Sequence, residues 1–144
     1  MTDAADRKTI LLADDDAEMR RMVRRALASF DADIIEAKDG EETIERIVEH
    51  HPDLVVLDVW MPEFKGWEVC KYIRSKADYD DIAVLMLTGI GKSINEMTAP
   101  LYGADDHLDK PFDVAVLQAK VKRLLQGRPD PAEAAASEDD DDEG

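Results

Sequence analysis

Short apolar runs that end directly at a polar, chemically useful side chain recur along this sequence. The runs cover residues 10–13, 54–57, 82–87 and, more weakly, 104–108, and the residues that follow them are Asp14 with Asp15, Asp58, Thr88 and Lys110. In a parallel α/β sheet, ligands bind outside the carboxyl ends of the strands. Such a sheet would bring three carboxylates, a hydroxyl and an ammonium group into one crevice, which suits a divalent metal and a phosphoryl group.

Segments with helical periodicity separate these runs and complete an alternating pattern. We expect one further strand at 33–37, and helices from the N-cap Asp16 to about residue 29, then at 41–50, 67–76, 93–102 and 113–126. Pro100 should shorten or kink the fourth of these helices. Strands joined by helices of this length predict an α/β fold, a (βα)5 doubly wound parallel sheet of five strands with helices on both faces.

Length and charge predict one domain with polar ends. The chain has 144 residues and a net charge of −16. Residues 127–144 carry eight acids and one base, have no apolar periodicity, and are therefore expected to form a disordered acidic tail. We expect a flexible N-terminus at 1–8 and one globular domain at 9–126. The acidic balance speaks against nucleic acid and anionic membranes as partners.

The remaining composition favours a cytoplasmic location. No apolar run approaches the 18 or so residues of a membrane span, and the first eight residues lack the apolar core of a signal peptide. The single cysteine, Cys70, cannot form an internal disulfide and is read as a small buried side chain. His50 and His51 are interpreted as an ordinary helix end rather than as metal ligands.

The polar residues at the strand ends predict phosphoryl transfer to a carboxylate. Three converging carboxylates repel one another unless a cation lies among them, and Mg²⁺ prefers one or two carboxylates together with phosphate oxygens. Asp58 would then act as the nucleophile and become an aspartyl phosphate. Lys110 would contribute a second positive charge to the phosphoryl oxygens, and Thr88 a hydroxyl donor.

With these residues, the chain resembles a known family, the receiver domain of two-component response regulators, over residues 9 to about 126. The motifs that carry the resemblance are 10–16, 52–62 with Gly66, 87–89 and 103–112. The resemblance implies the strand order 2-1-3-4-5, which is known for this family. It also implies that Asp58 is the phosphoacceptor and that the donor is a histidine kinase or a phosphotransfer histidine.

The same resemblance implies roles for the other site residues. Asp14 and Asp15 would hold Mg²⁺ together with Asp58 and the backbone carbonyl of Trp60. Thr88 would be the switch hydroxyl that turns toward the phosphoryl group, and Lys110 the family's invariant lysine, followed by a peptide bond that is often cis. His107 occupies the position of the second switch residue, where Tyr or Phe is commonest.

These expectations combine into a stand-alone response regulator that switches a protein-binding surface and catalyses only its own phosphorylation and dephosphorylation. Two alternatives compete with this prediction: a receiver-like interaction module that is never phosphorylated, and a metal-dependent phosphatase. The phosphatase is disfavoured because Trp60 stands where a second acid is expected. Four arginines of the first predicted helix form either a solvated face or a docking site for the kinase; they are Arg20, Arg21, Arg24 and Arg25.

Overall fold

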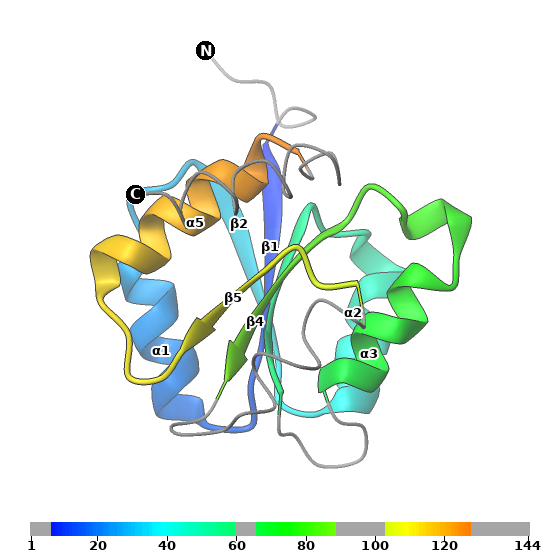
Figure 1. Ribbon diagram of the computed structural model, residues 1–144, viewed down its shortest axis with the longest axis horizontal. Helices are drawn as coiled ribbons and strands as arrows, with labels where there is room; N and C mark the ends of the chain where they lie inside the picture. Colours follow the sequence, from blue (N-terminus) through cyan, green and yellow to red (C-terminus); the bar gives the residue numbers. More distant parts are fainter. Residues whose placement is uncertain (1–6, 60–65, 89–102, 128–144) are drawn as a thin grey trace, which may run out of the picture.

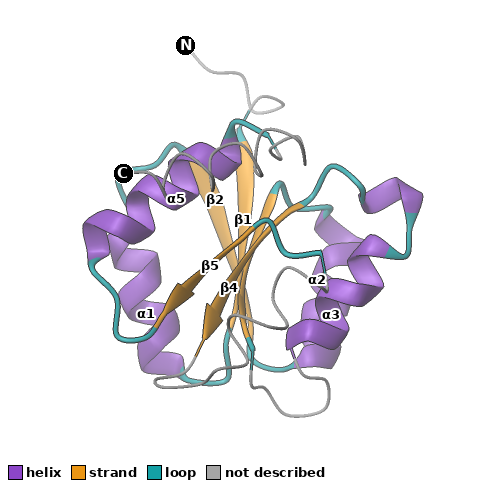
Figure 2. Cartoon of the chain, viewed as in Figure 1, coloured by secondary structure: helices purple, strands orange, loops and turns teal. Residues whose placement is uncertain are grey.

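The computed structural model describes residues 7–59, 66–88 and 103–127. The strands are β1 (Lys8–Ala13), β2 (Ala32–Ala37), β3 (Leu54–Asp58), β4 (Ala83–Thr88) and β5 (Asp106–Asp109). The helices are α1 (Ala17–Ala26), α2 (Gly40–His50), α3 (Gly66–Arg74), the short 3₁₀ helix η2 (Ala77–Tyr79) and α5 (Val114–Leu125). Figure 1 follows the chain through this alternation of strand and helix, and Figure 2 separates the two kinds of element.

All five strands lie parallel in one sheet, in the order β2-β1-β3-β4-β5. Both the predicted α/β class and the order implied by the resemblance are therefore confirmed. The sheet stands between two helical layers, with α1 and α5 on one face and α2 and α3 on the other (Figure 1). Parallel strands covered on both faces are buried throughout, which explains why their sequences are continuous apolar runs.

The two faces of the sheet build two separate cores from alternate residues of the same strands. In β3, Val55 and Leu57 join the cluster under α2 and α3, whereas Leu54 and Val56 join the cluster under α1 and α5. All five residues of β3 are buried, as expected for the central strand. Because successive side chains of a strand point to opposite faces, one residue of slippage would exchange the two cores.

Carboxylates cap three of the helices. The side chains of Asp16, Asp39 and Asp113 accept hydrogen bonds from backbone N–H groups in the first turns of α1, α2 and α5. The predicted start of the first helix is thus confirmed. Its predicted end is wrong: α1 stops at Ala26 rather than near residue 29, because the next hydrogen bonds tighten to the spacing i→i−3, as in Ala28 N–H to Arg25 O.

The fifth strand also begins later than expected, at Asp106 rather than residue 104. Asp105 turns its carboxylate back onto the sheet, where it accepts from the Val84 N–H at 2.8 Å and pairs with Arg74 at 2.8 Å. The predicted helix at 93–102 with Pro100, and the predicted tail beyond 127, lie outside the described residues. None of the helices in the described part of the chain is long and apolar enough to cross a membrane.

Gly103 provides a test of how the chain enters β5. Its φ of +88° lies in the left-handed region, and a Cβ there would stand 2.5 Å from Cγ of Arg74, the residue whose Nε donates to the Gly103 carbonyl. We expect Gly103→Ala to lower the free energy of unfolding by roughly 1–3 kcal/mol in urea denaturation. Gly127→Ala is the matched control, because that φ is also positive but no atom lies within 4 Å. Equal losses for the two variants would contradict the steric argument.

Candidate functional site

The predicted site residues lie together at the carboxyl ends of the strands. Asp14 follows β1, Asp58 ends β3, Thr88 ends β4 and Lys110 follows β5. The backbone ladder holds these ends in register: the Val59 N–H donates to the Leu87 carbonyl at 3.0 Å, and the Lys110 N–H donates to the Thr88 carbonyl at 2.8 Å. Rigid strands, rather than loops alone, therefore set the spacing of the polar groups.

The acidic residues form a compact cluster. One carboxylate oxygen from each of Asp14, Asp15 and Asp58 lies within 4.8 Å of the other two. Asp14 and Asp58 are buried, whereas Asp15 is exposed, so one side of the cluster opens to solvent. Hard oxygen donors with an open side fit Mg²⁺, which binds a few carboxylates and keeps several waters. Trp60, whose carbonyl was expected to complete the set, lies outside the described residues.

Lys110, which follows the edge strand β5, reaches into this cluster. Its Nζ lies 3.1 Å from Oδ2 of Asp14 and 3.4 Å from Oδ1 of Asp58. Partial burial alone would lower the pKa of Lys110, but attraction to Asp58 and Asp14 outweighs it and raises the pKa above its ordinary value. The ammonium group therefore stays charged at neutral pH. The peptide bond from Lys110 to Pro111 is cis, as the resemblance implied.

Burial dominates the electrostatics of Asp14. Loss of water raises its pKa above the usual 3.8, although the Asp16 N–H and Lys110 both favour the charged form. The neutral acid is thus relatively favoured inside the fold. Carrying a charge at this position stores unfavourable free energy that a cation near the carboxylates would relieve.

Arg20 of α1 supports the loop that carries Asp14 and Asp15. This role was not predicted from the sequence. Arg20 donates to the backbone carbonyl of Asp14 at 2.7 Å and pairs with Glu36 of β2 at 2.8 Å. Arg24 also pairs with Glu36, at 2.7 Å, and these arginines lower the pKa of Glu36 despite its partial burial. Arg20 therefore braces the acidic loop against β2, and Arg24 ties α1 to the same strand.

Thr88 is buried and its hydroxyl is directed to β5. The hydroxyl donates a short hydrogen bond to Oδ1 of Asp109 and lies 3.4 Å from the carbonyl oxygen of Leu108. His107, expected as the second switch residue, is half-buried on the same strand, opposite Met86 in the ladder. Asp109 was not predicted as a site residue, because its contact with Thr88 depends on the register between β4 and β5.

Cys70 and His51 both have structural surroundings. Cys70 is fully buried in the core under α2 and α3. His51 ends α2 in a left-handed conformation and places Nε2 3.0 Å from Oδ1 of Asp81. Within the described part of the chain, the acidic triad is the one group of three or more potential metal ligands.

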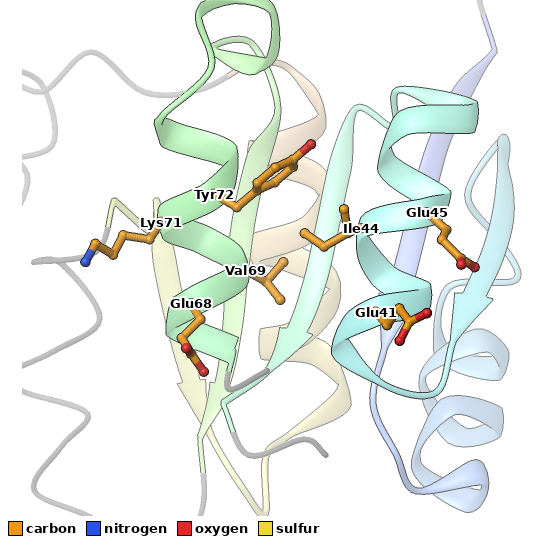
Figure 3. Close-up of a pocket in the computed structure, with 7 residues that line it drawn as sticks. All are labelled: Glu41, Ile44, Glu45, Glu68, Val69, Lys71 and Tyr72. Atoms are coloured by element: carbon orange, nitrogen blue, oxygen red, sulfur yellow. The ribbon is translucent and has the colours of Figure 1, made fainter. Parts of the chain in front are cut away.

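A groove of about 510 Å³ lies between α2 and α3, away from the acidic cluster. Figure 3 shows the apolar side chains of Ile44, Val69 and Tyr72 in the space between the two helices. Charged side chains stand at its border, and they are Glu41, Glu45, Glu68 and Lys71. The groove presents a mainly apolar wall and no convergent set of catalytic groups, so the chemistry is expected at the strand ends instead.

Comparison with known proteins agrees with this geometry. Residues 10–122 match the family model described as the response regulator receiver domain. The match spans most of the chain and includes every polar residue of the site described above, so the chain belongs to the response regulator receiver domain family.

Curated relatives and solved structures place the chain in the same group. It is 44% identical to "Response regulator MprA" of Mycobacterium leprae over 130 residues, covering 89% of this chain and 55% of the relative. It is 36% identical to "Probable transcriptional regulator ycf27" of Cyanophora paradoxa, covering 92% and 54%. The chain thus spans about half the length of these relatives.

Among solved structures, the chemotaxis response regulator CheY4 of Vibrio cholerae superposes with a TM-score of 0.74 at 28% identity, covering 82% of this chain and 98% of that chain. The receiver domain of Francisella response regulator 1452 superposes with a TM-score of 0.75 at 27% identity, covering 83% and 97%. The match to nearly the whole of both chains agrees with a single receiver fold.

The burial of Asp14 predicts a trade between stability and metal binding. Because the pKa of Asp14 is raised in the folded state, its contribution to stability is fullest below pH 3.8 and is lost as the pH rises through the folded value. We expect Asp14→Asn to raise the free energy of unfolding at pH 7 by about 1 kcal/mol without Mg²⁺. Mg²⁺ is expected to stabilise the parent chain, and the same variant should lose that stabilisation.

Urea denaturation with and without Mg²⁺, at pH 7 and pH 4, measures both effects, and the gap between Asp14→Asn and the parent should narrow at pH 4. Asp15→Asn is the control, because this carboxylate belongs to the same cluster but is exposed. It should weaken Mg²⁺ binding without a comparable gain in stability. A destabilised Asp14→Asn variant at pH 7 would contradict the argument.

Proposed function

We propose that this receiver domain accepts a phosphoryl group on Asp58 and, in doing so, switches a protein-binding surface. The observation that carries the proposal is the position of Lys110, whose ammonium group lies between Asp14 and Asp58 at the carboxyl ends of three strands. A buried nucleophilic carboxylate next to a fixed positive charge suits attack on an anionic phosphorus centre.

The proposed donor is a phosphohistidine of a histidine kinase or of a phosphotransfer protein. An oxygen of Asp58 forms the new O–P bond while the N–P bond of the donor breaks, and the electron pair of that bond stays on the donor nitrogen. The products are an aspartyl phosphate and a histidine free of its phosphoryl group. Hydrolysis later returns Asp58 to a carboxylate and releases inorganic phosphate.

Asp14, Asp15 and Asp58 are the described residues that would hold Mg²⁺. When bound, this ion supplies positive charge that offsets the repulsion between the carboxylates and an incoming phosphoryl group. Asp14 also keeps Lys110 in place through their 3.1 Å ion pair. Arg20 donates to the backbone carbonyl of Asp14 and so positions the loop that carries Asp14 and Asp15.

Lys110 and Thr88 are proposed to bind the phosphoryl group once it is on Asp58. A phosphoryl group on Asp58 adds negative charge and acceptor oxygens. Lys110 lies 3.4 Å from a carboxylate oxygen of Asp58 and is placed to engage them. Thr88 would leave its present partner on β5 to donate to the same group, and the resulting shift in populations would pass to the outer surface.

The output proposed here is binding to another protein from a cytoplasmic location, with no separate enzymatic activity. Support comes from the net charge of −16, which disfavours contact with nucleic acid by the domain itself. The chain spans about half the length of the relatives named as transcriptional regulators.

Intact mass spectrometry after incubation with acetyl phosphate and Mg²⁺ tests the proposal. A gain of about 80 Da, one phosphoryl group, is expected for the parent chain and is expected to vanish with EDTA or in Asp58→Asn. Asp53→Asn is the matched control, because Asp53 directly precedes β3, at the end of the strand opposite Asp58. If neither acetyl phosphate nor a phosphorylated histidine kinase modifies the chain, it acts instead as a phosphorylation-independent interaction module.

A further inference from the structure

The contact between Thr88 and Asp109 joins the last residue of β4 to the last residue of β5. The two residues are direct partners in the parallel ladder, and the Thr88 hydroxyl donates to Oδ1 of Asp109. Thr88 is buried, whereas Asp109 is exposed. The hydrogen bond therefore runs from the interior of the site to a carboxylate at its rim.

Sheet geometry fixes this pairing. Partner residues of neighbouring strands point to the same face, and side chains alternate along each strand. Leu108 packs into the core under α1 and α5, and Asp106 pairs with Lys120 of α5 at 3.0 Å, so these two residues face that helix. Asp109 must then face the opposite side, together with Thr88. The contact follows from the register and not from a chance side-chain rotation.

A threonine hydroxyl carries one proton and can make one full hydrogen bond as a donor. In the structure that proton goes to a carboxylate, and a charge-assisted bond of this kind is stronger than one to a neutral acceptor. The carbonyl oxygen of Leu108, at 3.4 Å, is a longer alternative. A phosphoryl oxygen on Asp58 can receive the same proton only if Asp109 gives it up.

We propose that Asp109 is a positioning residue that competes with the phosphoryl group for the Thr88 hydroxyl and thereby sets the balance between the unmodified and modified forms of the switch. The inference rests on the function proposed for Asp58. It adds a second acceptor at the rim of the site, which holds Thr88 toward β5 until the phosphoryl oxygens arrive. Removing this acceptor should favour the modified form.

Beryllofluoride, which adds to an aspartate as a phosphoryl mimic, measures this balance without a kinase. In Mg²⁺, we expect Asp109→Ala to bind beryllofluoride about threefold to tenfold more tightly than the parent chain, since the Thr88 hydroxyl no longer leaves a charged acceptor. Asp109→Asn removes the charge but keeps an acceptor oxygen, so its affinity should lie nearer that of the parent. The affinity for Mg²⁺ alone should be the same in all three.

A double-mutant cycle separates competition for the hydroxyl from the loss of a nearby negative charge. In a Thr88→Ala background, Asp109→Ala should leave beryllofluoride affinity unchanged, because no hydroxyl remains to be contested. In a Thr88→Ser background, the tightening should return. A gain from Asp109→Ala that persists without the hydroxyl would overturn the proposal and assign the effect to charge alone.

A readout without metal or phosphoryl mimic completes the test. Three-bond couplings from the Thr88 γ-methyl carbon to its backbone nitrogen and carbonyl carbon report χ1, which should be one staggered rotamer in the parent chain and an average in Asp109→Ala. Unchanged couplings together with unchanged beryllofluoride affinity would overturn the role of Asp109 while leaving the phosphoacceptor intact. A parent chain that binds no beryllofluoride at all would instead overturn the proposed function.

Discussion

Two buried carboxylates that face one ammonium group are the constraint around which the site is arranged. Asp14 and Asp58 sit at adjacent strand ends, and Lys110 lies within 3.4 Å of both. Removing such charges from water is costly unless they are paired, so the three side chains hold one another in place. One positive charge does not balance two negative ones and the exposed Asp15 beside them. The site is therefore built with a deficit of positive charge that favours a cation.

Few residues are needed for this arrangement, because parallel strands all end at the same edge of the sheet. Each core residue of β1, β3 and β4 serves one of two clusters, and the polar residue appears at the point where the apolar run stops. Supporting contacts come from farther away, with Arg20 and Glu36 behind the acidic loop and Arg74 with Asp105 before β5. These side-chain contacts add to the backbone hydrogen bonds that the same segments make with neighbouring strands, from Asp14 N–H to Ala37 O and from Asp105 N–H to Val84 O.

Much of this could be predicted from the sequence because the signals are local. An apolar run followed by Asp58 or Thr88 marks a strand end without any knowledge of the neighbours, and Asp16 marks a helix start. The strand order came from a family resemblance rather than from periodicity. The role of Asp109 and of Arg20 could not be predicted, because a hydroxyl partner across β4 and β5, or a guanidinium partner on a distant carbonyl, exists only once register and helix packing are set.

The ion pairs with Glu36 make the four arginines of α1 unequal. Arg20 and Arg24 both pair with Glu36, but only Arg20 is largely covered; Arg24, Arg21, Arg25 and the apolar Met22 are exposed. A partner that meets this face encounters Arg24 already paired with Glu36, together with the exposed Arg21, Arg25 and Met22, rather than four equivalent arginines. Loss of phosphorylation in a variant of Arg20 would accordingly indicate a loosened acidic loop. Loss of phosphorylation in a variant of Arg21 or Arg25 would indicate a missing contact with the phosphoryl donor.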